Sequence, residues 1–266
     1  MIYAKKEADI KNNRILYVEA PFDKALEAIE SKGGKIITAK QFADARMQYD
    51  TNNSLSTNGS YIKEGNLFVP NNKHKRILLR NSLVLKNPAE ATQAHREGKE
   101  YAIPGTVDSV LGKLKDGKDY LVLDSLDAVP TDRFGEDERM KFLFGESAQD
   151  YGLWLKDKGN VSKTGFYNFR DDSYIDKQGG LFAGQLWLHR LDFNYSYIDG
   201  YLRYLDYNYR VRGVQRIGGA DAPKKSVVET YTPRQIQTLV VKSLNSAGIK
   251  GPTQKSIISD LEKRLK

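Results

Sequence analysis

The chain contains no cysteine among its 266 residues. A disulfide framework, a thiolate metal site and a cysteine nucleophile are therefore excluded. No apolar run reaches the roughly 18 residues that a membrane span needs, and residues 1–20 contain no apolar core of signal-peptide length. We therefore expect no membrane span and no signal peptide. The protein should be cytoplasmic, or displayed on a cell or virus surface by another route.

Metal-ligating patterns are also scarce. The three histidines, His74, His95 and His189, lie in unrelated contexts without a partner at helical spacing. We therefore expect no metal, and nothing in the sequence indicates another cofactor.

Two acidic segments have alternative interpretations. Asp171, Asp172 and Asp176 could ligate a cation, but acidic turns are common, and we interpret them as a turn. Residues 97–100, EGKE, contain the Glu-x-Lys of many nucleases without an evident acidic companion on a preceding strand. We interpret this segment as a solvated helix end. No nucleophile, base and oxyanion donor can be assembled, so we predict no enzymatic activity.

The composition is that of a globular protein. Apolar residues make up 39% of the chain and aromatic residues 11%, which is enough for a substantial core in one large or two small domains. The net charge of +8 comes from lysines and arginines spread along the chain, so nucleic-acid binding is permitted but not indicated.

Hydrophobic periodicity and turn residues predict the order of elements. Helices are predicted after Pro21 up to Gly33, at 39–48 behind a Thr38 cap, and over most of 136–159, with a shorter one at 87–99. Residues 61–82 alternate like a hairpin around Asn71, and 50–60 are predicted to be a loop. Further strands are predicted at 13–20, 118–126, 164–169, 184–193 and 209–217. The composition changes after the segment 218–225, and the sequence of residues 232–266 predicts two helices around a Gly/Pro turn.

One stretch is unusually rich in tyrosine. Residues 192–214, DFNYSYIDGYLRYLDYNYRVRGV, hold six of the sixteen tyrosines. Their spacing fits neither period 2 nor period 3.6, so a single buried stripe cannot take them all. Tyrosine mixed with Asn, Ser, Asp and Gly is typical of antibody paratopes, whereas the alternative is ordinary strands and turns.

Two distant segments together resemble a known family. Residues 33–46, GGKIITAKQFADAR, resemble the signature of C-type lectin folds of the formylglycine-generating-enzyme type. The matching positions in it are Gly34, Lys35, Thr38, Phe42, Ala45 and Arg46. The far end of that fold is similar to QLWLHRL and YRVRGVQR here, through Trp187, Tyr209, Val211, Arg212, Val214 and Arg216. The resemblance implies that the first and last strands pair, so residues 14–19 should pair with 209–214.

Motifs of the family that are missing from this chain narrow the range of functions that the resemblance implies. Formylglycine-generating enzymes act through cysteines, which this chain lacks. The Glu-Pro-Asn or Gln-Pro-Asp triplets of calcium-dependent sugar lectins are also absent. The remaining branch is the variable protein of diversity-generating retroelements, of archaeal, viral or phage origin, in which adenines in codons near the end of the domain are randomised.

Residue content is consistent with this branch. Randomising both adenines of an AAC or AAT codon cannot give Lys, Glu, Gln, Trp or Met. These five types make up 55 of the 266 residues, yet none occurs in the 27 residues from Leu188 to Val214. We therefore predict a variable region at about 188–209.

The prediction divides this region into exposed and buried positions, because random substitutions are tolerated only where side chains face solvent. The positions expected to face a ligand are His189, Asp192, Asn194, Tyr195, Tyr197, Asp199, Tyr201, Arg203, Tyr204, Asp206, Tyr207 and Asn208. Those expected to form the core beneath are Leu186, Trp187, Leu191, Leu202, Leu205, Val211 and Val214.

The sequence as a whole predicts an α+β protein. Residues 1–220 should form a C-type lectin fold with an antiparallel sheet, two helices and long irregular connections, and 221–266 a helical tail. The predicted function is recognition of a macromolecular ligand, most simply a protein, through a hypervariable surface. The alternative is a nucleic-acid-binding protein that uses its basic charge and the tail, where Gly248, Ile249 and Lys255 resemble small DNA-binding modules. The tail can equally be a hairpin that docks its apolar stripe.

Overall fold

The computed structural model describes residues 2–10, 12–191, 196–200 and 205–217. Residues Met1–Ile217 form one compact unit. The predicted tail at 221–266 lies outside the described residues. No helix in the described part is long and apolar enough to cross a membrane.

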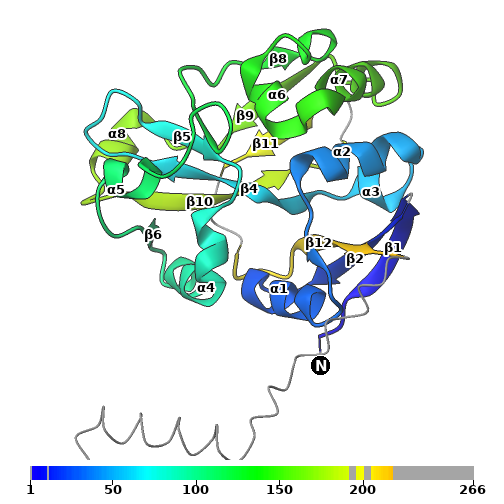
Figure 1. Ribbon diagram of the computed structural model, residues 1–266, viewed down its shortest axis with the longest axis horizontal. Helices are drawn as coiled ribbons and strands as arrows, with labels where there is room; N and C mark the ends of the chain where they lie inside the picture. The colour runs from blue at the N-terminus through cyan, green and yellow to red at the C-terminus, as the bar shows by residue number, and fades with distance from the viewer. Residues whose placement is uncertain (1, 11, 192–195, 201–204, 218–266) are drawn as a thin grey trace, which may run out of the picture. The chain divides into compact units, whose positions relative to one another are not determined.

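Short strands and helices alternate along the unit (Figure 1). The strands are β1 Lys5–Ile10, β2 Asn13–Glu19, β3 Lys35–Ile36, β4 Ser60–Phe68, β5 Arg76–Leu79, β6 Tyr101–Ala102, β7 Tyr120–Val122, β8 Val129–Pro130, β9 Lys163–Tyr167, β10 Phe182–Leu188, β11 Ser196–Asp199 and β12 Arg210–Arg216. The helices are α1 Phe22–Glu30, α2 Ala39–Gln48, α3 Ser54–Thr57, α4 Pro88–Arg96, α5 Val107–Leu111, α6 Glu138–Phe144, α7 Ala148–Asp157 and α8 Asp172–Asp176.

The pairing predicted between residues 14–19 and 209–214 is present, between the second strand and the last described one. β12 pairs antiparallel with β2 from Arg210 opposite Glu19 to Arg216 opposite Asn13. The sheet runs in the order β1-β2-β12-β4-β10-β11-β9-β8. Most of the strand pairs are antiparallel, as expected, but β11 pairs parallel with β9 and β12 contacts β4 in parallel.

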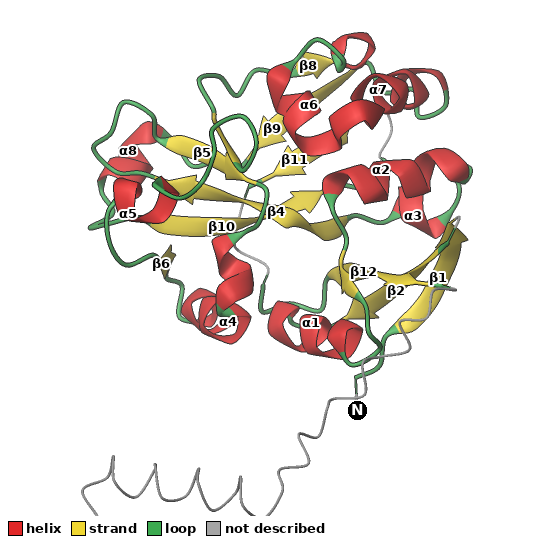
Figure 2. Cartoon of the chain, viewed as in Figure 1, coloured by secondary structure: helices red, strands yellow, loops and turns green. Residues whose placement is uncertain are grey.

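Helices cover both faces of the sheet (Figure 2). Successive side chains of a strand point to opposite faces of the sheet, so each face has its own hydrophobic cluster. In β5, for example, Leu78 packs into the first cluster and its neighbours Ile77 and Leu79 into the second. Helices α2, α6 and α7 bury side chains in the first cluster, and α1 and α4 in the second. Two helices were expected in the lectin-type domain, and its described residues contain more.

Local sequence signals explain most element boundaries. Thr38 accepts a hydrogen bond from Gln41 N at 3.1 Å and forms a capping box at the start of α2, as predicted. Helix α1 ends just before Gly33, whose φ of 70° favours glycine. The hairpin of β4 and β5 turns near Asn71, which has a φ of 53°.

Two segments differ from the prediction. The supposed loop at 50–60 contains α3, in which Asn53 caps the N-terminus and Leu55 is fully buried. β1 was not predicted as a strand because its sequence, KKEADI, is mostly charged. It nevertheless buries Ala8 and Ile10 against the core.

Candidate functional site

A pocket of about 530 Å³ opens where several strand ends meet. Its walls come from the end of β2, the start of β4, the end of β9, β10, β11 and the start of β12. The lining residues are Glu19, Asn58, Gly59, Tyr61, Asn168, Trp187, His189, Arg190, Tyr197, Asp199, Asn208, Tyr209 and Arg210. We call this hollow the aromatic pocket, because five of these residues carry aromatic rings.

Trp187 of β10 forms one wall of the aromatic pocket. Its ring packs edge-on against Tyr61 at 4.9 Å and Tyr209 at 5.4 Å between centroids. A Cβ on Gly59 would lie 2.5 Å from the indole, so only glycine lets the ring lie there. Trp187 was predicted to be a core residue, but it is only half-buried because one side lines the pocket.

A second wall is built from rings of the predicted variable region. The imidazole of His189 stacks on Tyr197 with centroids 3.9 Å apart, and Tyr167 lies 5.3 Å from Tyr197. Tyr207 and Tyr209 lie 6.2 Å apart on the other side. Tyr167 and Tyr207 are 60% and 58% exposed, far more than an aromatic side chain in the core. Three of the exposed rings of the described region, Tyr167, Tyr207 and Tyr209, thus lie in or beside this pocket.

Asp199 was expected to face a ligand, and the structure places it in the lining of the aromatic pocket as a largely buried residue. The residue is only 9% exposed, and its Oδ2 accepts a hydrogen bond from Asn168 Nδ2 at 3.0 Å. Burial raises the pKa of its carboxyl to about 6, against which the Asn168 hydrogen bond acts. Asp199 therefore forms part of the pocket wall, where its charge changes near neutral pH.

Asp206 was also expected to face a ligand, and it lies elsewhere. Its Oδ1 is 2.7 Å from Nδ1 of His95 on α4, and the imidazole is mostly buried. Asp206 does not line the aromatic pocket. This pairing joins α4 to the chain before β12, so both residues have a structural contact.

The other predicted ligand-facing residues divide into two groups. His189, Tyr197 and Asn208 line the aromatic pocket, and Tyr207 lies beside it. Asp192, Asn194, Tyr195, Tyr201, Arg203 and Tyr204 lie outside the described residues, as does Leu202 of the predicted core. Among the other core predictions, Leu186, Leu205 and Val211 are fully buried. Leu191 and Val214 are partly buried and pack against the core.

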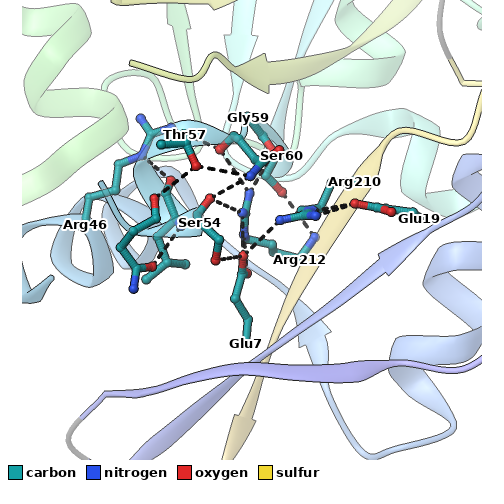
Figure 3. Close-up of polar contacts among 12 residues, drawn as sticks. Glu7, Glu19, Arg46, Ser54, Thr57, Gly59, Ser60, Arg210 and Arg212 are labelled. Carbon is teal, nitrogen blue, oxygen red and sulfur yellow. Dashed lines mark hydrogen bonds and ion pairs between the residues drawn. The ribbon is translucent and has the colours of Figure 1, made fainter. Parts of the chain in front are cut away.

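Two buried arginines hold the chain beneath the aromatic pocket (Figure 3). Arg46 of α2 donates hydrogen bonds to Leu55 O at 2.9 Å, Tyr151 Oη at 2.9 Å and His189 O at 2.7 Å. Its guanidinium also lies over the Phe42 ring at 4.2 Å. Arg46 therefore fixes the main chain at the point where the predicted variable region begins.

The guanidinium of Arg212, on β12, also lies over the Phe42 ring, 4.8 Å from its centroid. It donates to both carboxylate oxygens of Glu7, at 2.5 and 2.7 Å, and to Gly59 O at 2.7 Å (Figure 3). Burial alone would raise the pKa of Glu7, but the hydrogen bonds and charge of Arg212 outweigh it and lower that pKa below its usual value. We call Glu7, Arg46 and Arg212 the arginine layer.

Arg210 joins the arginine layer to the pocket. Its guanidinium bonds Glu19, which lines the pocket, and lies 3.2 Å from Glu7 Oε1 (Figure 3). The guanidinium of Arg210 in the pocket wall is thus paired with carboxylates of β1 and β2.

The acidic residues considered as cation ligands take separate partners. Asp171 caps α8 by accepting from Tyr174 N at 2.7 Å, Asp172 pairs with Arg76, and Asp176 pairs with Lys75. No group of three or more His, Asp or Glu side chains in the described region is placed to hold a metal ion.

The segment at 97–100 is not a solvated helix end throughout. Glu100 is mostly buried and bonds both Arg170 and the Tyr174 hydroxyl. Its carboxylate therefore has a structural role in tying this segment to α8.

The fold can now be compared with known structures. A protein from Nanoarchaeota, described as accommodating massive sequence variation by the C-type lectin fold, has a solved structure similar to this one with a TM-score of 0.56. The chain has the C-type lectin fold. The match covers 78% of this chain and 99% of that chain, with 19% sequence identity. A scan against protein-family models finds no match, and a search of curated proteins finds none.

Sequence reasoning missed the pocket residues that lie outside the variable region. Glu19, Asn58, Gly59 and Asn168 come from three separate segments, and only the fold brings them together. The Asn58-Gly59 pair is typical of a turn, and this pattern could have indicated that the chain bends at that part of the pocket. Glu7 gave no signal, because its strand was not predicted.

Proposed function

We propose that the protein is a non-catalytic binding protein that recognises a protein ligand through the aromatic pocket and the tyrosines around it. The observation that carries this proposal is that four residues of the predicted variable region, His189, Tyr197, Asn208 and Tyr207, line or border one pocket. Exposed tyrosine and histidine rings provide contact area with little loss of side-chain entropy on binding.

The arginine layer beneath the pocket is compatible with sequence variation at the pocket surface. The arginine layer contacts the main chain at Leu55, Gly59 and His189 through their carbonyl oxygens. A carbonyl oxygen is the same whatever the side chain, so these contacts survive substitution at position 189. The face can then vary in sequence while its backbone stays in place.

We further propose that a diversity-generating retroelement produces this variation. The absence of Lys, Glu, Gln, Trp and Met from 188–214 supports the proposal, since randomised Asn codons cannot encode them. The Nanoarchaeotal protein of the same fold is described as accommodating massive sequence variation. Nucleic-acid binding, the alternative, depends on the C-terminal tail, which lies outside the described residues.

Binding is tested with a displayed library. The codons of His189, Tyr197, Tyr207 and Asn208 are replaced by AAT codons randomised at both adenines, and clones are selected on streptavidin and on serum albumin. We expect separate clones specific for each probe, whose binding is lost when the four parental residues are restored. Failure to enrich any specific clone on either probe would contradict the recognition function.

The origin of the variation is tested in the genome. Sequencing around the gene should show a reverse transcriptase gene and a near-copy of the codons for 188–214 that differs at adenines. Finding neither, with identical 188–214 codons in every isolate of the source population, would rule out retroelement diversification.

A further inference from the structure

We infer that Tyr167 and Asn168, at the end of β9, are constant contact residues of the recognition surface. They lie outside the region predicted to vary, so they would meet every protein ligand that the variable residues select. This inference rests on the proposed function.

The first observation is the position of the Tyr167 ring. β9 pairs parallel with β11, and Tyr167 lies opposite Asp199 in the register. The ring is 60% exposed and lies 5.3 Å from the Tyr197 ring, which stacks on His189. The rings of Tyr167, Tyr197 and His189 therefore form a continuous row. Tyr167, at the β9 end of this row, lies outside the region predicted to vary.

The second observation is the conformation of Asn168. Its φ of 53° is in the left-handed region, which residues other than glycine seldom adopt. In this conformation its amide donates to Asp199 Oδ2 at 3.0 Å, and the residue lines the aromatic pocket. Left-handed non-glycine residues cluster at binding sites, where the surrounding structure holds them.

The third observation is a second hollow. A shallower depression of about 630 Å³ is lined by Tyr167 and Asn168 together with Arg76, Arg170 and Tyr174, among others. Asn168 thus lines both hollows, and its neighbour Tyr167 lines the second one. None of the residues lining the second hollow belongs to the predicted variable region.

The ligand suited to such a face is a protein surface. A small molecule could fill the aromatic pocket alone, whereas contact with the exposed ring of Tyr167 requires a ligand that extends beyond the pocket. Tyrosine is enriched among the residues that account for most of the affinity in protein interfaces. Tyr167 would supply affinity common to all ligands, and His189, Tyr197, Tyr207 and Asn208 would discriminate among them.

The experiment uses the clones selected on streptavidin and on serum albumin, made as full-length chains. Tyr167→Ser is placed in each clone, with Tyr167→Phe as the conservative variant and Tyr3→Ser as the control. Tyr3 is matched in type and exposure, at 58%, and lines neither hollow. Affinities are measured by biolayer interferometry, and thermal melting verifies folding.

The expected result is an at least tenfold loss of affinity for both probes with Tyr167→Ser, about twofold or less with Tyr3→Ser, and most affinity retained with Tyr167→Phe. Asn168→Gly, which allows the same φ without the amide, should also weaken both probes. If Tyr167→Ser and Asn168→Gly leave both affinities unchanged in clones that bind, the inference is wrong and the proposed function stands. If no clone binds either probe, the proposed function fails, and this inference fails with it.

Discussion

The arginine layer and the rim of the aromatic pocket lie next to each other and differ in what they bury. Charged groups are buried in the layer, whereas aromatic rings are exposed at the rim. Below, Arg46 and Arg212 are fully buried, and their guanidinium groups bond a carboxylate, a tyrosine hydroxyl and main-chain carbonyls. At the rim, Tyr207 and Tyr209 are 58% and 38% exposed. The buried arginines bond the main chain at Leu55, Gly59 and His189, so we expect side chains at the rim to change without loss of the fold.

The largest expected effect comes from Glu7→Ala. Removing this carboxylate leaves Arg212 buried without a counter-charge, which should reduce the free energy of unfolding by about 3–5 kcal/mol. Urea denaturation at pH 7 measures the loss. Glu19→Ala is the control, because Glu19 is half-exposed and its ion pair with Arg210 should contribute only about 1 kcal/mol or less. Equal losses in the free energy of unfolding of the two variants would contradict the distinction between a stabilising buried layer and an exposed rim.

Glu64 offers a contrast with Glu7, since it is buried without a cation in hydrogen-bonding contact. Its Oε2 accepts from Ala39 N at 2.9 Å, and burial raises its pKa to about 7 against that hydrogen bond. A raised carboxyl pKa means that the stabilising contribution is present below about pH 4.5 and is lost as the pH rises through 7.

Glu64→Gln should therefore match the wild type near pH 4.5 and exceed its free energy of unfolding by about 3 kcal/mol at pH 9. Denaturation at a series of pH values measures the difference. A difference that is constant across the series would show that Glu64 does not titrate in this range.

Trp187→Ala should have an intermediate effect. A fully buried tryptophan would cost about 3–5 kcal/mol, but Trp187 is half-buried, so we expect about 2–3 kcal/mol. The same variant should remove one wall of the aromatic pocket and abolish binding in selected clones. A loss of stability below 1 kcal/mol would mean that the Gly59 and Tyr61 contacts contribute little.

The smallest effect should come from Tyr207→Ser. The ring is 58% exposed, and exposed substitutions change the free energy of unfolding by about 0.5 kcal/mol or less. Thermal melting should detect almost no shift. A loss as large as that of Trp187→Ala would place Tyr207 in the core.

The sequence predicted those parts of the fold in which local pattern and position agree. Thr38 marks the start of α2 by its side-chain cap, and Pro21 and Gly33 flank α1 because of their backbone preferences, so both helices were predicted closely. The pairing of β2 with β12 was predicted from the resemblance, and the structure adds that Arg46 and Arg212, one from each signature segment, both lie over the Phe42 ring.

The candidate site was predicted only in part, because exposure is a tertiary property. Composition located the region around His189 and Tyr197, but could not show that Asp199 turns inward to Asn168 or that Asp206 pairs with His95. Glu7 was missed because a charged edge strand has no hydrophobic alternation. Its partner Arg212 lies more than 200 residues away along the chain.

The central claim, that the rim varies freely above a fixed layer, is tested most directly by comparing two libraries for folding. One randomises His189, Tyr197, Tyr207 and Asn208 with the adenine-mutagenised codons, and the other places the same mixture at the buried residues Tyr61, Leu186, Leu188 and Val211. Sequencing before and after protease selection measures the folded fraction. The account predicts that most rim variants survive and few buried variants do. Equal survival of the two libraries would contradict it.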